Sequence, residues 1–227
     1  RIGREAVIVP NKYQQEMVIT SNGGTSKLKL LMEVLPRPEL RVSIDRLDYT
    51  KGVVNRLLAF ERFLDTYPQY RDKIRLVMLA VPSRSKVAQY KKLKRQTDEV
   101  VGRINGKFAS VNWTPVWYYY RSMEFENLID LYVSSDVAMI TPLRDGMNLV
   151  AKEYLATRIN NDGVLILSEL AGSSKELPQA LLVNPFDIEQ LSEFIKIALE
   201  MPLKEQKERK QKDTQKEKKG RKRQRNQ

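Results

Sequence analysis

Cysteine and histidine are both absent from this chain of 227 residues. Without them the chain by itself can form neither a Ser-His-Asp nor a Cys-His catalytic group, and it has no thiolate or imidazole ligand for a metal. The absence of cysteine also excludes a disulfide framework. Carboxylates, lysines, arginines and backbone dipoles remain, and these groups suit the binding of anionic substrates and the stabilisation of a phosphate leaving group.

Long apolar stretches are missing as well. No run of about 18 apolar residues could span a bilayer, and the opening residues Arg1 to Arg4 are not followed by the apolar core of a signal peptide. Hydrophobic residues make up 41% of the chain and charged residues 30%, as in soluble globular proteins. The sequence therefore predicts a cytoplasmic protein with no membrane partner.

The positive charge is concentrated at the C-terminal end. The formal net charge is +12, and residues 204–227 contribute +8 of it, with twelve Lys or Arg against four Asp or Glu. No apolar residue follows Leu203, so this segment is interpreted as a disordered or weakly helical tail. A basic tail alone is weak support for nucleic-acid binding, and we do not expect nucleic acid as a partner.

Apolar runs typical of strands alternate with stretches at helical spacing. The expected strands are residues 41–46, 74–81, 116–120, 137–141, 164–168 and 181–184. The expected helices are residues 53–66, 85–101, 124–134, 148–157 and 187–200. This alternation predicts an α/β fold, with a Rossmann-like parallel sheet and helices on both faces. The expected parts are an N-terminal segment without a clear pattern (1–40), the Rossmann-like domain (41–203) and the basic tail (204–227).

Ligands of open α/β sheets bind outside the carboxyl ends of the strands, so the loops after the strands are the places to search. In the first loop, Arg46, Lys51 and the start of the following helix could bind a diphosphate. Alternatively, Arg46 and Lys51 pair with Asp45 and Asp48 on a solvated loop. In the second loop, Arg84 points toward the same crevice, although Ser83 or Ser85 could be there only as a helix cap.

The third loop runs from Thr141 to Glu153. Asp145 and Glu153 lie about two helical turns apart, and carboxylates can accept hydrogen bonds from the vicinal hydroxyls of a sugar and a ribose. Alternatively, Asp145 caps the helix and Glu153 pairs with Lys152 or another surface cation. The aromatic run at 113–120 could stack on nucleic-acid bases, but the aromatic residues also fit a buried strand, which we favour.

Four motifs at these positions resemble one known family. They are SIDRLDYTKG at 43–52, GRINGK at 102–107, VNWTP at 111–115, and RDGMNLV at 144–150 followed by Glu153-Tyr154. In this spacing they closely resemble the trehalose-6-phosphate synthases, from about Arg41 to about Leu203. The resemblance implies one half of a GT-B glycosyltransferase, in which two Rossmann-like domains face a cleft. It implies transfer of glucose from UDP-glucose to glucose 6-phosphate, with retention of configuration and with no cofactor or required metal.

The resemblance also implies roles for individual residues. The implied donor-binding residues are Arg46, Lys51, Asp145, Gly146, Met147, Asn148, Leu149, Val150 and Glu153. Arg46 and Lys51 would bind the UDP diphosphate and, with Asp145, would be catalytic. Asp145 and the turn at 146–149 would grip the donor glucose, Val150 would line the nucleotide site, and Glu153 would hold the ribose. Arg84 would bind the phosphate of glucose 6-phosphate.

The chain departs from the family pattern in three places. The family's N-terminal acceptor domain is not part of this sequence, residues 5–40 do not follow the expected pattern, and the basic tail stands where a C-terminal helix is usual. We therefore expect this chain to be the donor-binding half, acting with a missing acceptor domain or with a full-length synthase. The alternative is a nucleotide-sugar-binding module without turnover, a truncated paralogue of a synthase.

Overall fold

The computed structural model describes residues 6–9, 16–21, 24–25, 39–83, 87–210 and 212, with side chains from Leu47 onward. The chain divides into two compact units, Arg1–Pro38 and Glu39–Gln227. The first unit holds a three-stranded antiparallel sheet in the order β1-β2-β3. Its strands are β1 (Ala6–Val9), β2 (Glu16–Ser21) and β3 (Gly24–Thr25).

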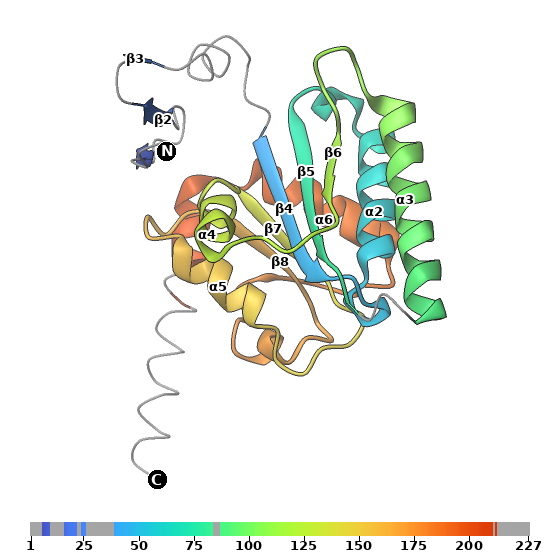
Figure 1. The fold of residues 1–227 in the computed structure, drawn as a ribbon. Helices are drawn as coiled ribbons and strands as arrows, with labels where there is room; N and C mark the ends of the chain where they lie inside the picture. Colours follow the sequence, from blue (N-terminus) through green and yellow to red (C-terminus); the bar gives the residue numbers. More distant parts are fainter. Residues whose placement is uncertain are drawn as a thin grey trace. The chain divides into compact units, whose positions relative to one another are not determined.

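The second unit is built on a six-stranded parallel sheet in the order β6-β5-β4-β7-β8-β9 (Figure 1). Its strands are β4 (Glu39–Arg46), β5 (Ile74–Val81), β6 (Val116–Tyr119), β7 (Val137–Ile140), β8 (Val164–Ser168) and β9 (Leu181–Val183). All six strands that the apolar runs predicted are therefore confirmed. Near-continuous burial of β5, β7 and β8 explains these runs, because a parallel sheet is covered on both faces.

Helices cover both faces of this sheet, as predicted. They are α2 (Val53–Thr66), α3 (Ala88–Phe108), α4 (Phe125–Val133), α5 (Leu149–Thr157) and α6 (Ile188–Glu200). The helix α3 extends seven residues past the predicted end at Val101. The reason is that its buried face continues from Val100 through Ile104 to Phe108, and Gly102 and Gly106 lie on the exposed side.

Two hydrophobic clusters lie on opposite faces of the sheet. Met78 of β5 packs in the cluster that α2, α3 and α6 cover, whereas the next residue, Leu79, packs in the cluster of α4 and α5. Figure 1 shows α2 and α3 on one side of the strands and α4 and α5 on the other. Alternation along each strand thus assigns successive side chains to different layers.

The strand order reverses beside β4. From β4 the chain proceeds to β5 and β6 on one side, and then returns to β7, β8 and β9 on the other. The strands β4 and β7 are parallel neighbours, with Arg41 opposite Val137. The loops that follow these two strands therefore meet at a topological switch point, where open α/β sheets bind their ligands.

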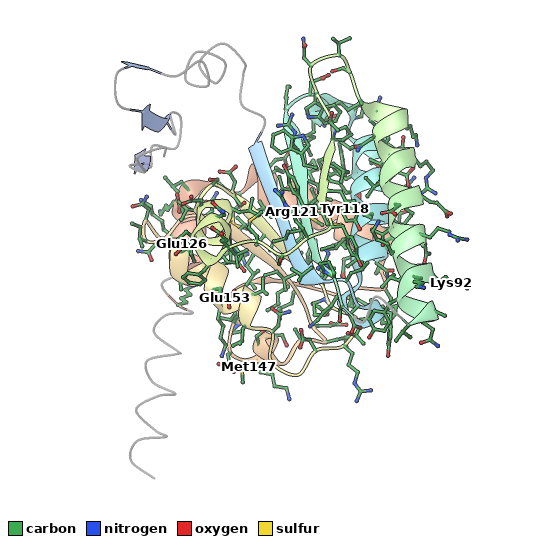
Figure 2. All side chains as sticks on the ribbon, in the orientation of Figure 1. Lys92, Tyr118, Arg121, Glu126, Met147 and Glu153 are labelled. Atoms are coloured by element: carbon green, nitrogen blue, oxygen red, sulfur yellow. The ribbon has the colours of Figure 1, made fainter. Side chains whose placement is uncertain are left out.

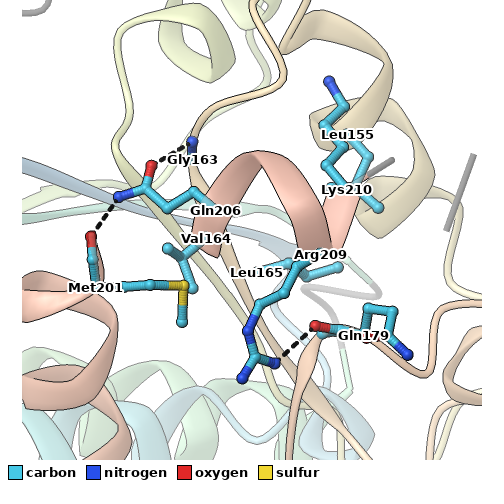
Figure 3. A pocket seen from close by; sticks show the side chains of 10 residues that line it. Leu155, Gly163, Val164, Leu165, Gln179, Met201, Gln206, Arg209 and Lys210 are labelled. Carbon is cyan, nitrogen blue, oxygen red and sulfur yellow. Dashed lines mark hydrogen bonds between the residues drawn. The ribbon is translucent and has the colours of Figure 1, made fainter. Parts of the chain in front are cut away.

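The folded unit continues beyond Leu203, where the sequence analysis placed the start of a tail. Residues 203–210 are helical, and the Gln206 side chain accepts a hydrogen bond from Gly163 N (3.0 Å) and donates one to Met201 O (2.8 Å) (Figure 3). Lys210 donates to Arg158 O, and burial lowers the pKa of Lys210 to about 8. Hydrogen bonds from polar side chains to backbone groups thus attach this segment to the folded unit, although it has no apolar residue after Leu203. The rest of the predicted tail, apart from Lys212, lies outside the described residues.

Candidate functional site

The loop after β4 forms the first wall of the site. Asp48 caps the 3-10 helix η1 (Tyr49–Lys51), accepting a hydrogen bond from Thr50 N at 2.9 Å. Gly52 follows with φ 65° and is the N-cap residue of α2, which begins at Val53. A Cβ atom on Gly52 would lie 2.4 Å from Thr141 O, so this loop touches the end of β7 where only glycine fits.

The second wall is the loop after β7, and polar contacts tie it to the first. Thr50 O accepts hydrogen bonds from Leu143 N (2.7 Å) and Arg144 N (3.1 Å). The Lys51 ammonium forms an ion pair with Asp145 Oδ2, and the two side chains are only 12% and 16% exposed. Lys51 thus pairs across the switch point, whereas the alternative from the sequence was a local pair with Asp45 or Asp48.

Residues 145–148 lead into α5 and are called the donor loop below, after the donor-binding role that the family resemblance implies for them. Asn148 has φ 63° and caps this helix, because its side-chain oxygen accepts from Ala151 N at 3.1 Å. Its Nδ2 donates to Asp145 Oδ2 at 3.0 Å. The helix cap is therefore Asn148, so the alternative that made Asp145 the cap is wrong. Asp145 Oδ2 instead pairs with the Lys51 ammonium and accepts the hydrogen bond from Asn148.

Apolar residues adjoin this polar centre in the sequence. Met147 and Leu149 are 54% and 58% exposed, although both are large and hydrophobic. Val150 is partly buried, and Gly146 has no neighbour within 4 Å of its Cβ position. Exposed apolar groups beside buried polar ones are typical of a surface that binds a ligand with an apolar ring face.

Glu153 lies on α5, one turn beyond the donor loop (Figure 2). Its Oε2 accepts a hydrogen bond of 2.9 Å from the hydroxyl of Tyr132, a buried residue of α4. Lys152 pairs instead with Glu176 at 2.6 Å, so the alternative of a Glu153–Lys152 pair is wrong. Sequence reasoning missed Tyr132, since nothing in the period of α4 indicates where its hydroxyl points.

The turn after β8 supports the donor loop from the other side. Ala171 and Asp145 form an isolated parallel bridge, Gly172 N donates to Asp145 O (3.1 Å), and Ser173 N donates to Met147 O (3.1 Å). Sequence reasoning missed this turn as well. The available signal was its run of small residues, Ala171 to Ser174, directly beyond a buried strand.

The other two predicted cations are located only in part. Arg46 is the last residue of β4 and is paired in register with Val81, while its side chain lies outside the described part of the structure. Arg84 lies outside the described residues altogether. The register nevertheless brings the loop after β5 to the same edge of the sheet as the loop after β4.

A surface hollow of about 270 Å³ lies beside η1. It is lined by Tyr49, Gln89, Lys92, Leu93 and Gln96. The rings of Tyr49 and Tyr90 pack edge-to-face, with 5.8 Å between the ring centroids. The cavity of Figure 3 is different, since it measures about 20 Å³ and lies beside Gly163 and Val164, at the start of β8. It is too small for a sugar and lies at the wrong end of the strand.

Two findings concern what the described residues lack. They contain no group of three or more carboxylate, imidazole or thiolate side chains arranged to hold a metal ion. None of their helices combines the length and the apolar character that crossing a membrane requires.

Residues 11–221 match the sequence model of glycosyltransferase family 20. The chain belongs to this family. The resemblance to trehalose-6-phosphate synthases is confirmed by relatives such as the bifunctional trehalose-6-phosphate synthase/phosphatase of Thermoproteus tenax, which is 53% identical over 176 residues. That match covers 78% of this chain and 24% of the relative. A glucosylglycerol-phosphate synthase of Picosynechococcus is 43% identical over 199 residues, which cover 88% of this chain and 40% of the relative.

Solved structures of the family 20 enzymes show the same fold. A UDP-forming α,α-trehalose-phosphate synthase from Burkholderia xenovorans matches with a TM-score of 0.79 at 43% identity, covering 84% of this chain and 43% of that one. A structure from E. coli bound with UDP-2-fluoro glucose matches with a TM-score of 0.78 at 42% identity, covering 82% and 42%. The predicted fold, one half of a GT-B glycosyltransferase, is thus confirmed, and the chain spans less than half the length of these relatives.

Proposed function

We propose that this chain is the donor-binding half of a glycosyltransferase that transfers glucose from UDP-glucose to glucose 6-phosphate, giving trehalose 6-phosphate and UDP. The observation that carries the proposal is the Lys51–Asp145 ion pair at the switch point. It places a cation suited to a diphosphate beside a carboxylate suited to sugar hydroxyls, in the loops where this family carries its motifs. The E. coli structure bound with UDP-2-fluoro glucose has this fold and supports UDP-glucose as the donor.

In this proposal Arg46 and Lys51 bind the diphosphate of the donor. Lys51 is largely shielded from water, so its charge acts on the leaving diphosphate with little screening. Preorganised donors of this kind stabilise developing charge by about 3 kcal/mol each. Both residues are therefore proposed as catalytic groups.

The donor loop and α5 divide the rest of the donor between them. Asp145 accepts hydrogen bonds from the glucose hydroxyls, while the backbone of Gly146 to Leu149 surrounds the sugar. Met147 offers an apolar contact because its side chain is exposed beside the loop. Val150 lines the nucleotide, and Glu153, held by Tyr132, accepts hydrogen bonds from the ribose.

The transfer itself is proposed to retain configuration and to need no metal. The bond between C1 of glucose and the diphosphate oxygen breaks, and a new bond forms from the acceptor hydroxyl oxygen to C1 on the same face. The hydroxyl proton passes to the departing phosphate oxygen. Arg46 and Lys51 neutralise the negative charge that grows on the leaving diphosphate, which a metal ion would otherwise do. Because the acceptor oxygen attacks C1 directly, on the face from which the diphosphate leaves, no protein nucleophile takes part.

The acceptor is the less defined substrate. Arg84 is proposed to bind the phosphate of glucose 6-phosphate, and we propose that a facing domain supplies the other acceptor contacts, within a longer polypeptide or from a full-length synthase. Relatives named for different products, a trehalose 6-phosphate and a glucosylglycerol phosphate, match this half almost equally well. This half is therefore proposed to select the donor, and the facing domain to select the acceptor.

Calorimetry with UDP and UDP-glucose tests the proposal directly. We expect the chain to bind both ligands, and UDP-glucose more tightly, because Asp145 contributes only when the hexose is present. Titration with ADP-glucose is the control that shows whether the chain distinguishes uracil from another base. A correctly folded chain that binds neither UDP nor UDP-glucose would show that the proposed function is wrong.

A further inference from the structure

The turn after β8 contacts the donor loop through two consecutive backbone amides. Gly172 N donates to Asp145 O and Ser173 N donates to Met147 O, each at 3.1 Å. The acceptors are alternate carbonyls of the donor loop. On its other side, Thr50 O holds Leu143 and Arg144, so the backbone around Asp145 is fixed from both neighbouring strands.

Gly172 is required at this turn by the closeness of the donor loop. A Cβ atom on Gly172 would lie 1.8 Å from Gly146 O and 2.8 Å from Gly146 C. Both atoms belong to the backbone, so no side-chain rotation can relieve the overlap. The φ angle of Gly172 is not in the left-handed region, so the backbone conformation alone would accept any residue.

The turn is anchored more firmly than the donor loop. Ala171 and Leu177 are buried in the cluster that α4 and α5 cover, and Leu177 N donates to Ser173 O at 2.9 Å. The donor loop, in contrast, carries the exposed Met147. An added methyl group at Gly172 would therefore displace the donor loop, rather than the turn.

We propose that Gly172, with the amides of Gly172 and Ser173, is a positioning element for the donor hexose. The inference rests on the proposed role of Asp145 and adds a group that touches no substrate. The turn sets where the Asp145 backbone lies, and thereby where its carboxylate meets the glucose hydroxyls. The groups assigned to the diphosphate and the ribose, Lys51 and Glu153, stand on η1 and α5. The turn can affect Lys51 through its ion pair with Asp145. A bound diphosphate offers this ammonium another anion, so we expect UDP binding to depend on the turn much less than hexose binding does.

The test is the full chain carrying Gly172→Ala, titrated with UDP and with UDP-glucose. We expect affinity for UDP-glucose to fall about tenfold, because small displacements of a binding group cost this much or more, while affinity for UDP stays within about twofold. The matched control is Gly102→Ala, where the same methyl group meets nothing within 4 Å. An equal loss for both ligands, or an unchanged preference in a folded Gly172→Ala chain, overturns the inference.

Hydrogen exchange of the unmodified chain provides a second measurement, which decides the matter if Gly172→Ala does not fold. The Gly172 and Ser173 amides bond to the donor loop, so UDP-glucose should slow their exchange more than UDP does. Equal protection by the two ligands overturns the inference. If the unmodified chain shows no preference for UDP-glucose over UDP, the proposed role of Asp145 fails as well. If it shows the preference and Gly172→Ala retains it, only the positioning role fails.

Discussion

Lys51 and Asp145 are 94 positions apart in the sequence, and their side chains form an ion pair between the loops of two neighbouring strands. The pair is largely shielded, so each charge compensates the other before any ligand arrives. A diphosphate that approaches Lys51 offers this ammonium a second anion. Asp145 then becomes free to accept hydrogen bonds from the hexose, which couples recognition of the two parts of the donor.

The first prediction concerns the diphosphate. Replacing Arg46 and Lys51 together by Ala should weaken UDP binding at least tenfold, or about 1.4 kcal/mol, because both cations are lost. Calorimetry on the folded variant measures the effect. The control is the double replacement of Arg103 and Lys107 by Ala. It also removes two positive charges, but these residues form exposed ion pairs with Glu61 and Asp65, respectively. Unchanged UDP affinity in the Arg46/Lys51 variant would contradict the assignment.

The second prediction separates the two carboxylates. Asp145→Asn should lower affinity for UDP-glucose without weakening affinity for UDP. Only the hexose loses its acceptor, while Lys51 keeps its charge and loses the anion that competes with the diphosphate. Glu153→Gln should weaken both ligands, since both contain the ribose. Titration of each variant with both ligands measures this difference, and equal effects of Asp145→Asn on UDP and UDP-glucose would exclude the division.

The third prediction concerns Tyr132, whose hydroxyl orients Glu153. Tyr132→Phe removes the hydrogen bond to Glu153 and keeps the ring, so UDP and UDP-glucose should both bind about fivefold more weakly, as for a loss of about 1 kcal/mol. Tyr70→Phe is the control, because it removes a comparable hydrogen bond to Glu200. Wild-type affinity in Tyr132→Phe would show that Glu153 needs no such support.

The fourth prediction concerns stability. Gly52→Ala forces a residue with a Cβ into the left-handed region and against Thr141 O, so the free energy of unfolding should fall by about 1–3 kcal/mol. Gly106→Ala, on the exposed face of the last turn of α3, should instead raise it by up to about 1 kcal/mol. Urea denaturation of both variants measures the change. A Gly52→Ala chain as stable as Gly106→Ala would contradict the contact with β7.

The fifth prediction is that this chain by itself binds UDP-glucose but makes little trehalose 6-phosphate. All the donor groups named above come from this chain, whereas Arg84 is the only acceptor group assigned to it. Positioning of two reactants contributes roughly 7–11 kcal/mol, so losing half of that would slow the transfer about a thousandfold. Mass spectrometry of a mixture of the chain with UDP-glucose and glucose 6-phosphate measures the trehalose 6-phosphate formed. Turnover near that of a complete synthase would place the acceptor site within this chain.

The sequence by itself determined the strands, the layers and the strand-end loops. Continuous apolar runs such as 76–81 are typical of strands in a sheet covered on both faces, and RDGMNLV at 144–150 identified the family. Local patterns carry this information, because period and composition are properties of neighbouring residues. The roles of Arg46, Lys51, Asp145 and Glu153 toward the donor remain predictions.

Tertiary structure alone decided which partner each of these groups has. Asp145 could have capped α5, but Asn148 caps it, and Asp145 pairs with Lys51 instead. Tyr132 gave no local signal, because its importance depends on a carboxylate 21 positions away. The run of small residues around Gly172 was a local signal for a tight turn, but it did not reveal that the turn meets a backbone carbonyl of another loop. A weakly helical tail was one interpretation of the segment after Leu203, but the attachment of helix 203–210 to the folded unit was not predicted. Contacts with distant backbone groups hold this helix, and it has no apolar pattern of its own. Such contacts depend on distances between residues far apart in the chain, and these distances exist only once the sheet has formed.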